Sequence, residues 1–305
     1  MSGSKKKIQA LIIGANGLIG SYLGRLLTAK GVLWKGTSCH RASSNFLKLN
    51  VLEDDLDRVF SDFKPNVVFH CANLSGGVDF CEQNPEISKR FHLESIRKIG
   101  SYCKEIGATL VYFSTDYVFD GTKGPYREND APNPLNIYGK LKLQSEQWVQ
   151  ENLKKFLIIR TTNVYGWDPE TITPNYMMSL YRALKAGKTF YAPSFLFGSP
   201  TYVEDLVKGI FELYEKNERS VRSVFHVVGD SFINRFQWAL DASKILELDS
   251  SLVQELKGSL GNTVVRPQKS WLSNEKFKSF YKTKLNNHLE GLEAMRAVMK
   301  KNGDS

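Results

Sequence analysis

A glycine-rich turn near the N-terminus constrains the fold of this chain more than any other feature. It reads Gly14-Ala15-Asn16-Gly17-Leu18-Ile19-Gly20, between the apolar run Ile8–Ile13 and a stretch of helical spacing from Leu18 to Lys30. Glycines at this spacing let backbone N–H groups approach a pyrophosphate, and the positive end of the following helix favours its charge. The turn therefore predicts a dinucleotide site, with these residues at the cofactor: Gly14, Asn16, Gly17, Leu18, Ile19 and Gly20.

Strand-like and helix-like segments alternate from this turn to about Arg160. The alternation predicts an α/β fold with a Rossmann-type, doubly wound parallel sheet. The predicted strands are Ile8–Ile13, Val32–Thr37, Phe46–Val51, Val67–Cys71, Leu110–Ser114, Phe156–Arg160 and Ser223–Val228. The predicted helices are Leu18–Lys30, Pro85–Ile106, Tyr138–Leu153, Met177–Leu184 and one that begins at a Thr201/Glu204 capping box and runs to about Tyr214.

Prolines interrupt this rhythm beyond Gly166, and the region from about Phe232 onward has mostly helical patterns. We therefore expect two lobes. Residues 1–165 with about 201–228 are predicted to form the dinucleotide-binding domain. Residues of about 166–200 with 229–305 are predicted to form a smaller, mostly helical substrate-binding lobe.

Composition excludes several classes of protein. Apolar residues make up 42% of the chain, and no apolar run approaches the roughly 20 residues that span a bilayer. The net charge of +9 is spread along the chain, which favours a solvated surface over nucleic-acid binding and is compatible with an anionic small ligand. The four cysteines form no CxxC pair, and no histidine stands at metal spacing, so we expect reduced thiols and no metal. We expect a soluble, cytoplasmic protein.

The end of the second predicted strand bears on the choice of cofactor. An NAD site usually has an acid there, whereas this chain reads Thr37-Ser38-Cys39-His40-Arg41. A guanidinium at this place can contact a 2′-phosphate. The sequence therefore favours NADP, with NAD as the alternative, and Arg41 as a solvent-facing loop residue is the other interpretation.

A second constellation lies where the fifth predicted strand ends. Ser114, Thr115, Asp116 and Tyr117 are followed about two dozen residues later by Tyr138, with Lys142 four positions beyond it. Residues four apart share one face of a helix. A phenol titrates near 10, and a nearby ammonium favours its phenolate. A hydroxyl at the strand end can hold a substrate oxygen beside that phenol.

Several strings resemble the dTDP-4-dehydrorhamnose reductase family of extended short-chain dehydrogenases/reductases. They are GANGLIG, FSTDYVFDG, PYRENDAPNPLNIYGKLKLQSE, RTTNVYG and GSPTYVEDL, and the resemblance covers roughly residues 8–275. It implies NAD(P)H-dependent reduction of a nucleotide-linked 4-keto-6-deoxy sugar. Tyr138 would donate a proton to the sugar oxygen, Lys142 would bind the cofactor ribose and tune Tyr138, and Thr115 would complete the catalytic set, with Ser114 as the alternative hydroxyl.

The resemblance also implies further roles. The segment after the fourth predicted strand, Cys71, Ala72 and Asn73, would lie alongside the cofactor. Asn163 would flank the nicotinamide and the substrate, and Asp205 resembles a structural acid of the family. Arg266 is the candidate for pairing with a substrate pyrophosphate, with a salt bridge that braces the lobe as the alternative. The implied substrate-binding residues are Thr115, Asp116, Tyr117, Asn163 and Arg266.

Two departures and two alternatives remain open. His92 stands where relatives usually carry Asn, and Asn73–Asp79 differs from the usual segment, so we expect the polar relay and the substrate contacts to differ from those of relatives. The family also includes the regulatory beta subunit of methionine adenosyltransferase, so a non-catalytic NADP-binding regulator is the alternative function. A nucleotide-sugar epimerase is a weaker alternative function. The sequence does not determine the oligomeric state, and a homodimer is compatible with it.

Overall fold

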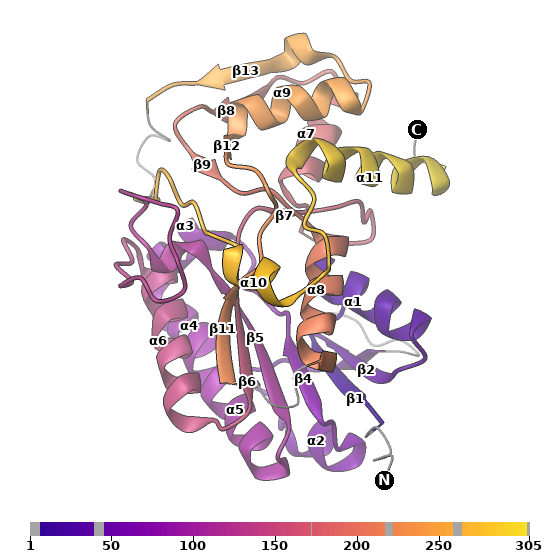
Figure 1. Ribbon diagram of the computed structural model, residues 1–305, viewed down its shortest axis with the longest axis vertical. Coiled ribbons are helices and arrows are strands. Elements are labelled where there is room, and N and C mark those ends of the chain that lie inside the picture. The colour runs from indigo at the N-terminus through magenta and orange to yellow at the C-terminus, as the bar shows by residue number, and fades with distance from the viewer. Residues whose placement is uncertain (1–6, 40–45, 172, 217–221, 259–263, 304–305) are drawn as a thin grey trace.

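A seven-stranded sheet forms the lower part of the computed structural model (Figure 1), which describes residues 7–39, 46–171, 173–216, 222–258 and 264–303. The strand order is β11-β6-β5-β4-β1-β2-β3, and every neighbouring pair is parallel. The strands are β1 (Gln9–Ile13), β2 (Leu33–Ser38), β3 (Phe46–Lys48), β4 (Val67–His70), β5 (Thr109–Thr115), β6 (Phe156–Thr161) and β11 (Arg222–His226). The chain order reverses between β1 and β4, the place where such sheets bind ligands at their carboxyl edge. The predicted Rossmann-type fold is confirmed.

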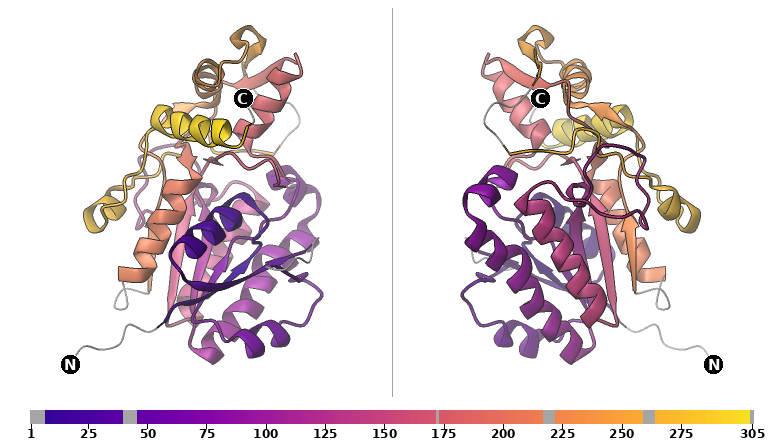
Figure 2. Two further views of the ribbon diagram at one scale, coloured as in Figure 1. Left: turned by 90° about the vertical axis from the view of Figure 1, so that its right-hand side faces the viewer. Right: turned by 90° about the vertical axis from the view of Figure 1, so that its left-hand side faces the viewer.

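Helices cover both faces of this sheet (Figure 2). Successive residues of β1 alternate between the two cores: Ala10 and Ile12 pack in one, Leu11 and Ile13 in the other. A strand buried on both faces must be apolar throughout, which explains the unbroken apolar runs in the sequence. One face carries α1 (Leu18–Ala29), α8 (Val203–Lys216) and α10 (Glu275–Phe280), and the other carries α2 (Asp57–Phe63), α5 (Ser95–Ile106) and α6 (Ile137–Asn152).

The predicted long helix from Pro85 to Ile106 is continuous but not uniform. It consists of α4 (Pro85–Lys89), a π-helical turn (Arg90–Glu94) and α5, and it follows α3 (Gly77–Gln83). A π turn inserts an extra residue into the helical repeat and often lies at a functional site. No residue pattern in this segment indicated the turn, which carries His92.

The upper lobe lies beyond the carboxyl edge of the sheet (Figure 1). Its own core includes Tyr165, Met178, Trp238 and Met295. Its elements are α7 (Tyr176–Lys185), β8 (Phe190–Pro193), β9 (Phe197–Gly198), β12 (Ile233–Asn234), α9 (Arg235–Ile245), β13 (Val253–Leu256) and α11 (His288–Lys301). Parallel β8 and β13 pair along one side, and antiparallel β9 and β12 pair nearer the sheet.

The predicted capping box at Thr201 is wrong. Thr201 belongs to the short strand β10 (Thr201–Tyr202), which pairs with β7 (Val164–Tyr165), and α8 begins only at Val203. Its hydroxyl donates to the Ser199 carbonyl at 3.1 Å and accepts from the Gly229 N–H. These bonds, and not the backbone N–H groups at the start of α8, therefore engage the Thr201 side chain. The tertiary pairing of two strands outweighs the local capping pattern here.

Among the helices that the structure describes, none has the length and apolar character needed to cross a bilayer.

Candidate active site

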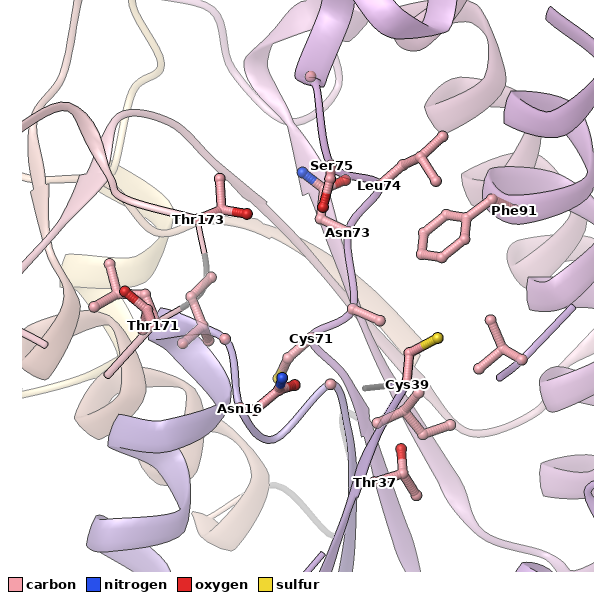
Figure 3. A pocket seen from close by; sticks show the side chains of 18 of the residues that line it. Asn16, Thr37, Cys39, Cys71, Asn73, Leu74, Ser75, Phe91, Thr171 and Thr173 are labelled. Atoms are coloured by element: carbon pink, nitrogen blue, oxygen red, sulfur yellow. The ribbon is translucent and has the colours of Figure 1, made fainter. Parts of the chain in front are cut away.

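A cavity of about 420 Å³ opens at the carboxyl edge of β1, β2 and β4 (Figure 3). Asn16 of the glycine turn faces it from one side, with Cys71 after β4 next to it, and Asn73 lines the cavity further along the same segment. Thr37 and Cys39 at the end of β2 form its far end. All of the predicted cofactor residues before Arg41 except Gly20 line this cavity, as do Cys71, Ala72 and Asn73.

The three glycines of the turn have different reasons to be glycine. Gly14 has a φ of +83°, and a Cβ there would lie 2.7 Å from the Ala72 backbone. A Cβ on Gly20 would lie 2.3 Å from the Gly14 carbonyl, so this position needs glycine for packing alone. Gly17 is not crowded in this way, because its nearest neighbour would be 3.5 Å away. Its lack of a side chain leaves room for a ligand at the N-terminus of α1, as a dinucleotide pyrophosphate requires.

The described residues at the far end of this cavity carry no negative charge. Thr37, Cys39, Asn50 and Val51 line it, and none of the described lining residues is acidic. Such an environment admits a 2′-phosphate without repulsion. Arg41, predicted to hold that phosphate, lies outside the described residues.

A loop from the upper lobe forms the wall opposite the glycine turn. Thr171, Thr173 and Asn175 line the cavity from this loop. Asp168 fixes the loop to α1, because its carboxylate accepts from the Ser21 hydroxyl at 2.5 Å and from Arg25 at 2.6 Å. Sequence reasoning missed this wall, since the contact joins residues about 150 positions apart with no shared motif.

A second cavity of about 340 Å³ adjoins the first, and Cys71, Ala72 and Asn73 line both. It brings together the following predicted residues: Thr115, Asp116, Tyr117, Tyr138, Lys142 and Asn163. Arg266 is not among the described residues that line it. A dinucleotide in the first cavity would therefore reach the Tyr138 side of the second.

The N-terminus of α6 fixes the position of Tyr138. The Asn136 side chain caps the helix by accepting from the Gly139 N–H at 2.9 Å, and Glu82 of α3 accepts from the Ile137 N–H at 2.9 Å. Gly139 must be glycine, because a Cβ there would lie 2.2 Å from the Tyr117 carbonyl. The helix therefore begins in close contact with the segment after β5, which places Tyr138 beside Thr115.

Tyr138 and Lys142 lie side by side at the base of the second cavity. The Lys142 ammonium is 5.8 Å from the centre of the Tyr138 ring and donates to the Phe113 carbonyl at 2.9 Å. Burial lowers the pKa of Lys142 to about 8, and the Glu146 carboxylate opposes this shift. Burial raises the pKa of Tyr138, an effect that the Thr115 side chain opposes. The raised pKa differs from the sequence-based interpretation, which expected the ammonium to favour the phenolate; because burial raises this pKa, the phenol keeps its proton at neutral pH.

Two residues with hydroxyls at the end of β5 line the same cavity as this phenol. The Thr115 hydroxyl donates to Asp116 at 3.1 Å and accepts from the Tyr117 N–H at 3.2 Å, so it also caps the following 3₁₀ turn. Ser114 also lines the cavity, and its buried hydroxyl has no hydrogen-bond partner in the described part of the chain. Burial raises the pKa of Asp116. Both hydroxyls therefore remain candidates for the substrate oxygen.

His92 packs directly behind Tyr138. The two rings meet edge to face with centres 5.3 Å apart, and His92 Nε2 lies 3.6 Å from the Cys81 sulfur. Burial lowers the pKa of His92 to about 2, and Lys142 adds to this, so the ring is neutral. His92 thus supports the phenol as a packed, uncharged ring.

Two arginines near the second cavity have different surroundings. Arg235 lines the cavity and donates to the Asn163 side chain at 3.3 Å. Arg266 instead pairs with Asp79 of α3 at 2.5 Å and donates to the Val264 carbonyl at 3.0 Å. This ion pair matches the bracing alternative considered for Arg266. No sequence motif marks Arg235, although a cation as the first residue of a helix opposes the helix dipole and is therefore unusual.

Asp205 lies away from both cavities. Its carboxylate accepts from the Asn286 backbone N–H at 2.9 Å, and so ties α8 to the segment before α11. Burial raises its pKa to about 6. This placement agrees with the structural role that the resemblance implied.

The parallel sheet, the glycine turn and the Tyr138/Lys142 pair define an extended short-chain dehydrogenase/reductase. Residues 8–301 match the RmlD substrate binding domain family. The chain belongs to this family, as the sequence predicted.

Solved structures with similar folds include dTDP-4-dehydrorhamnose reductases. One, from Bacillus anthracis str. Ames in complex with NADP, is 26% identical with a TM-score of 0.84, covering 96% of this chain and 100% of that one. A hypothetical dTDP-4-dehydrorhamnose reductase from Sulfolobus tokodaii is 30% identical with a TM-score of 0.81, covering 93% of this chain and 99% of that one.

Similar sequences include a protein of another kind. The methionine adenosyltransferase 2 subunit beta of Bos taurus is 30% identical over 270 residues, which is 87% of this chain and 80% of that protein. The spore coat polysaccharide biosynthesis protein SpsK of Bacillus subtilis (strain 168) is 29% identical over 273 residues, which is 87% of this chain and 89% of that protein.

Proposed function

We propose that this protein is an NAD(P)H-dependent reductase of a nucleotide-linked 4-keto-6-deoxy sugar. The observation that carries the proposal is the second cavity, which Tyr138, Lys142, Thr115 and Ser114 line and which adjoins the first cavity along Cys71, Ala72 and Asn73. Family membership and the fold of dTDP-4-dehydrorhamnose reductases support it.

The reaction that this geometry supports is proton donation to a carbonyl. The bound cofactor would supply the hydride. The Thr115 or Ser114 hydroxyl would hold the substrate oxygen against Tyr138, and Tyr138 would pass its proton to that oxygen. Lys142, with its ammonium anchored on the Phe113 carbonyl, would hold the cofactor ribose. His92 and Tyr117 would fix the phenol ring through edge-to-face contacts.

A panel of nucleotide-4-keto sugars tests the proposal directly. Purified protein should consume NADPH with at least one dTDP- or UDP-linked 4-keto-6-deoxy sugar, as followed by absorbance, and should release the reduced sugar nucleotide. Consumption without a reduced sugar product would contradict it.

Cofactor choice is the first point that a variant can test. We expect NADPH to bind more tightly than NADH, because none of the described residues at the far end of the first cavity is acidic. Arg41→Ala should weaken NADPH selectively, by about 1–3 kcal/mol for a lost charge-assisted contact. Fluorescence titrations of both cofactors against both proteins measure this. Equal losses for the two cofactors would remove Arg41 from the site.

The low pKa of Lys142 predicts a pH dependence of cofactor binding. Burial places this pKa at about 8, so the ammonium is present below that pH and is lost above it. If it holds the ribose, cofactor affinity should fall several-fold as the pH rises from 7 to 9.5. Lys142→Met should bind weakly at both pH values and show a flat profile. A profile in that variant as steep as in the wild type would assign the dependence to another group.

A regulatory role is the second candidate, favoured by the 30% identity to methionine adenosyltransferase 2 subunit beta. Such a subunit would bind the dinucleotide and a synthetase subunit without turning over a sugar. Stoichiometric co-purification with a methionine adenosyltransferase, together with inactivity across the sugar panel, would favour this role over the reductase.

A further inference from the structure

One charged group in the second cavity has no part in the proton donation described above. Arg235 is the first residue of α9, in the upper lobe, and its guanidinium lines the same cavity as Tyr138. The other charged residues among the described lining are already engaged: Lys142 donates to Phe113, and Asp116 accepts from Thr115.

The half-buried Arg235 has no counter-ion among the residues that the structure describes. Its guanidinium donates to the neutral side chain of Asn163 at 3.3 Å and lies over the Tyr176 ring, 5.4 Å from the ring centre. The described ion pairs include Arg25, Arg160, Arg266 and Arg296 but not Arg235. A partly desolvated cation without a partner is costly, and an anion in the cavity would relieve this cost.

The place of Arg235 in its helix adds a second argument. The N-terminus of a helix carries a partial positive charge, so a cation there is unfavourable and an anion is favourable. The guanidinium and the start of α9 therefore present positive charge from the same side. Because Tyr176 and Asn163 hold the side chain, it would lose little freedom on binding.

We propose that Arg235 binds an oxyanion of the substrate in this cavity. The oxyanion is a phosphate oxygen of a nucleotide diphosphate or a carboxylate on the linked sugar, and a guanidinium can meet either through two parallel hydrogen bonds. The assignment rests on the proposed function for the class of ligand. The proposal assigns to Arg235 the anion contact that the sequence had suggested for Arg266. The charge of Arg266 is already neutralised by its ion pair with Asp79.

Calorimetric titration of the full chain, saturated with NADP, tests the proposal without any turnover. The probes are dTDP, UDP-glucose and UDP-glucuronic acid, and the variants are Arg235→Met and Arg235→Lys. We expect Arg235→Met to weaken the binding of at least one probe about 10- to 100-fold. Arg235→Lys should restore part of the lost affinity, because lysine keeps the charge but cannot form the two parallel hydrogen bonds of a guanidinium. Arg182→Met, at an exposed position of α7, is the matched control and should change affinity less than twofold.

The three probes identify the oxyanion. A similar loss for all three assigns Arg235 to the diphosphate, and a loss confined to UDP-glucuronic acid assigns it to a sugar carboxylate. Unchanged affinity for every probe in Arg235→Met overturns the proposal, as does a failure of the wild type to bind any of them. A full effect in Arg266→Met with none in Arg235→Met would return the anion contact to Arg266.

The same data separate this inference from the reductase assignment. Arg235-dependent binding with no NADPH consumption on the sugar panel would remove the reductase and keep the oxyanion site. Sugar reduction that is unaffected in Arg235→Met would keep the reductase and remove the oxyanion site.

Discussion

Tyr138→Phe should lower the turnover number about 10²- to 10⁴-fold while cofactor affinity changes little. The substitution removes the transferable proton and keeps the ring that packs against His92 and Tyr117. General acid catalysis contributes a factor of this size in enzymes generally. The measurement is steady-state reduction of the sugar substrate identified in the panel, with NADPH affinity determined separately by titration.

Two variants make this result specific. Tyr117→Phe alters a neighbouring phenol in the same cavity and should reduce turnover far less, since no transferred proton is assigned to it. Lys142→Met should lower both turnover and cofactor affinity, because Lys142 contacts the phenol and the proposed ribose site. A Tyr138→Phe enzyme with near wild-type turnover would exclude Tyr138 as the proton donor and strengthen the regulatory alternative.

The features that sequence predicted well are those with local causes. The apolar run of β1, the glycine turn and the helical spacing of α1 follow one another along the chain, so the first βα unit could be read directly. The spacing of Tyr138 and Lys142 likewise fixes their shared helix face whatever surrounds the helix. Their approach to Thr115 followed from the order of parallel strands, whose carboxyl ends meet at one edge.

The features that sequence did not predict depend on contacts between distant segments. The π turn around His92 shifts the helix by one residue without any proline or glycine to mark it. The pairing of β10 with β7 took Thr201 away from the predicted cap. The protonated state of Tyr138 depends on burial by several elements at once, so the Lys142 spacing alone suggested the opposite shift. Arg235 reaches the cavity only because the upper lobe packs over the sheet edge.

Arg160→Met should destabilise the protein by about 3–5 kcal/mol, because it leaves a buried carboxylate without its partner. Arg160 of β6 donates three hydrogen bonds to Glu146 of α6: Nε to Oε1 at 3.0 Å, Nε to Oε2 at 3.2 Å and Nη2 to Oε2 at 2.7 Å. Their side chains are only 4% and 0% exposed. Glu146 stands two helical turns beyond Tyr138 on the face that carries Lys142, so the pair holds the catalytic helix on the sheet.

Equilibrium unfolding in urea measures this loss of stability. Two further variants of the protein serve as comparisons. Replacing both partners, as Arg160→Met with Glu146→Leu, should recover much of the stability, because the Glu146 carboxylate no longer stays buried without its arginine. Lys208→Met breaks the exposed pair with Glu204, where the side chains are 50% and 38% exposed, and should cost less than about 1 kcal/mol. If Arg160→Met does not fold, Arg160→Lys tests the same contact, since lysine keeps the charge but cannot form the parallel hydrogen bonds of the guanidinium. A cost at Arg160 no larger than that at Lys208 would show that Glu146 finds another partner or a proton, and that α6 is held by its packing alone.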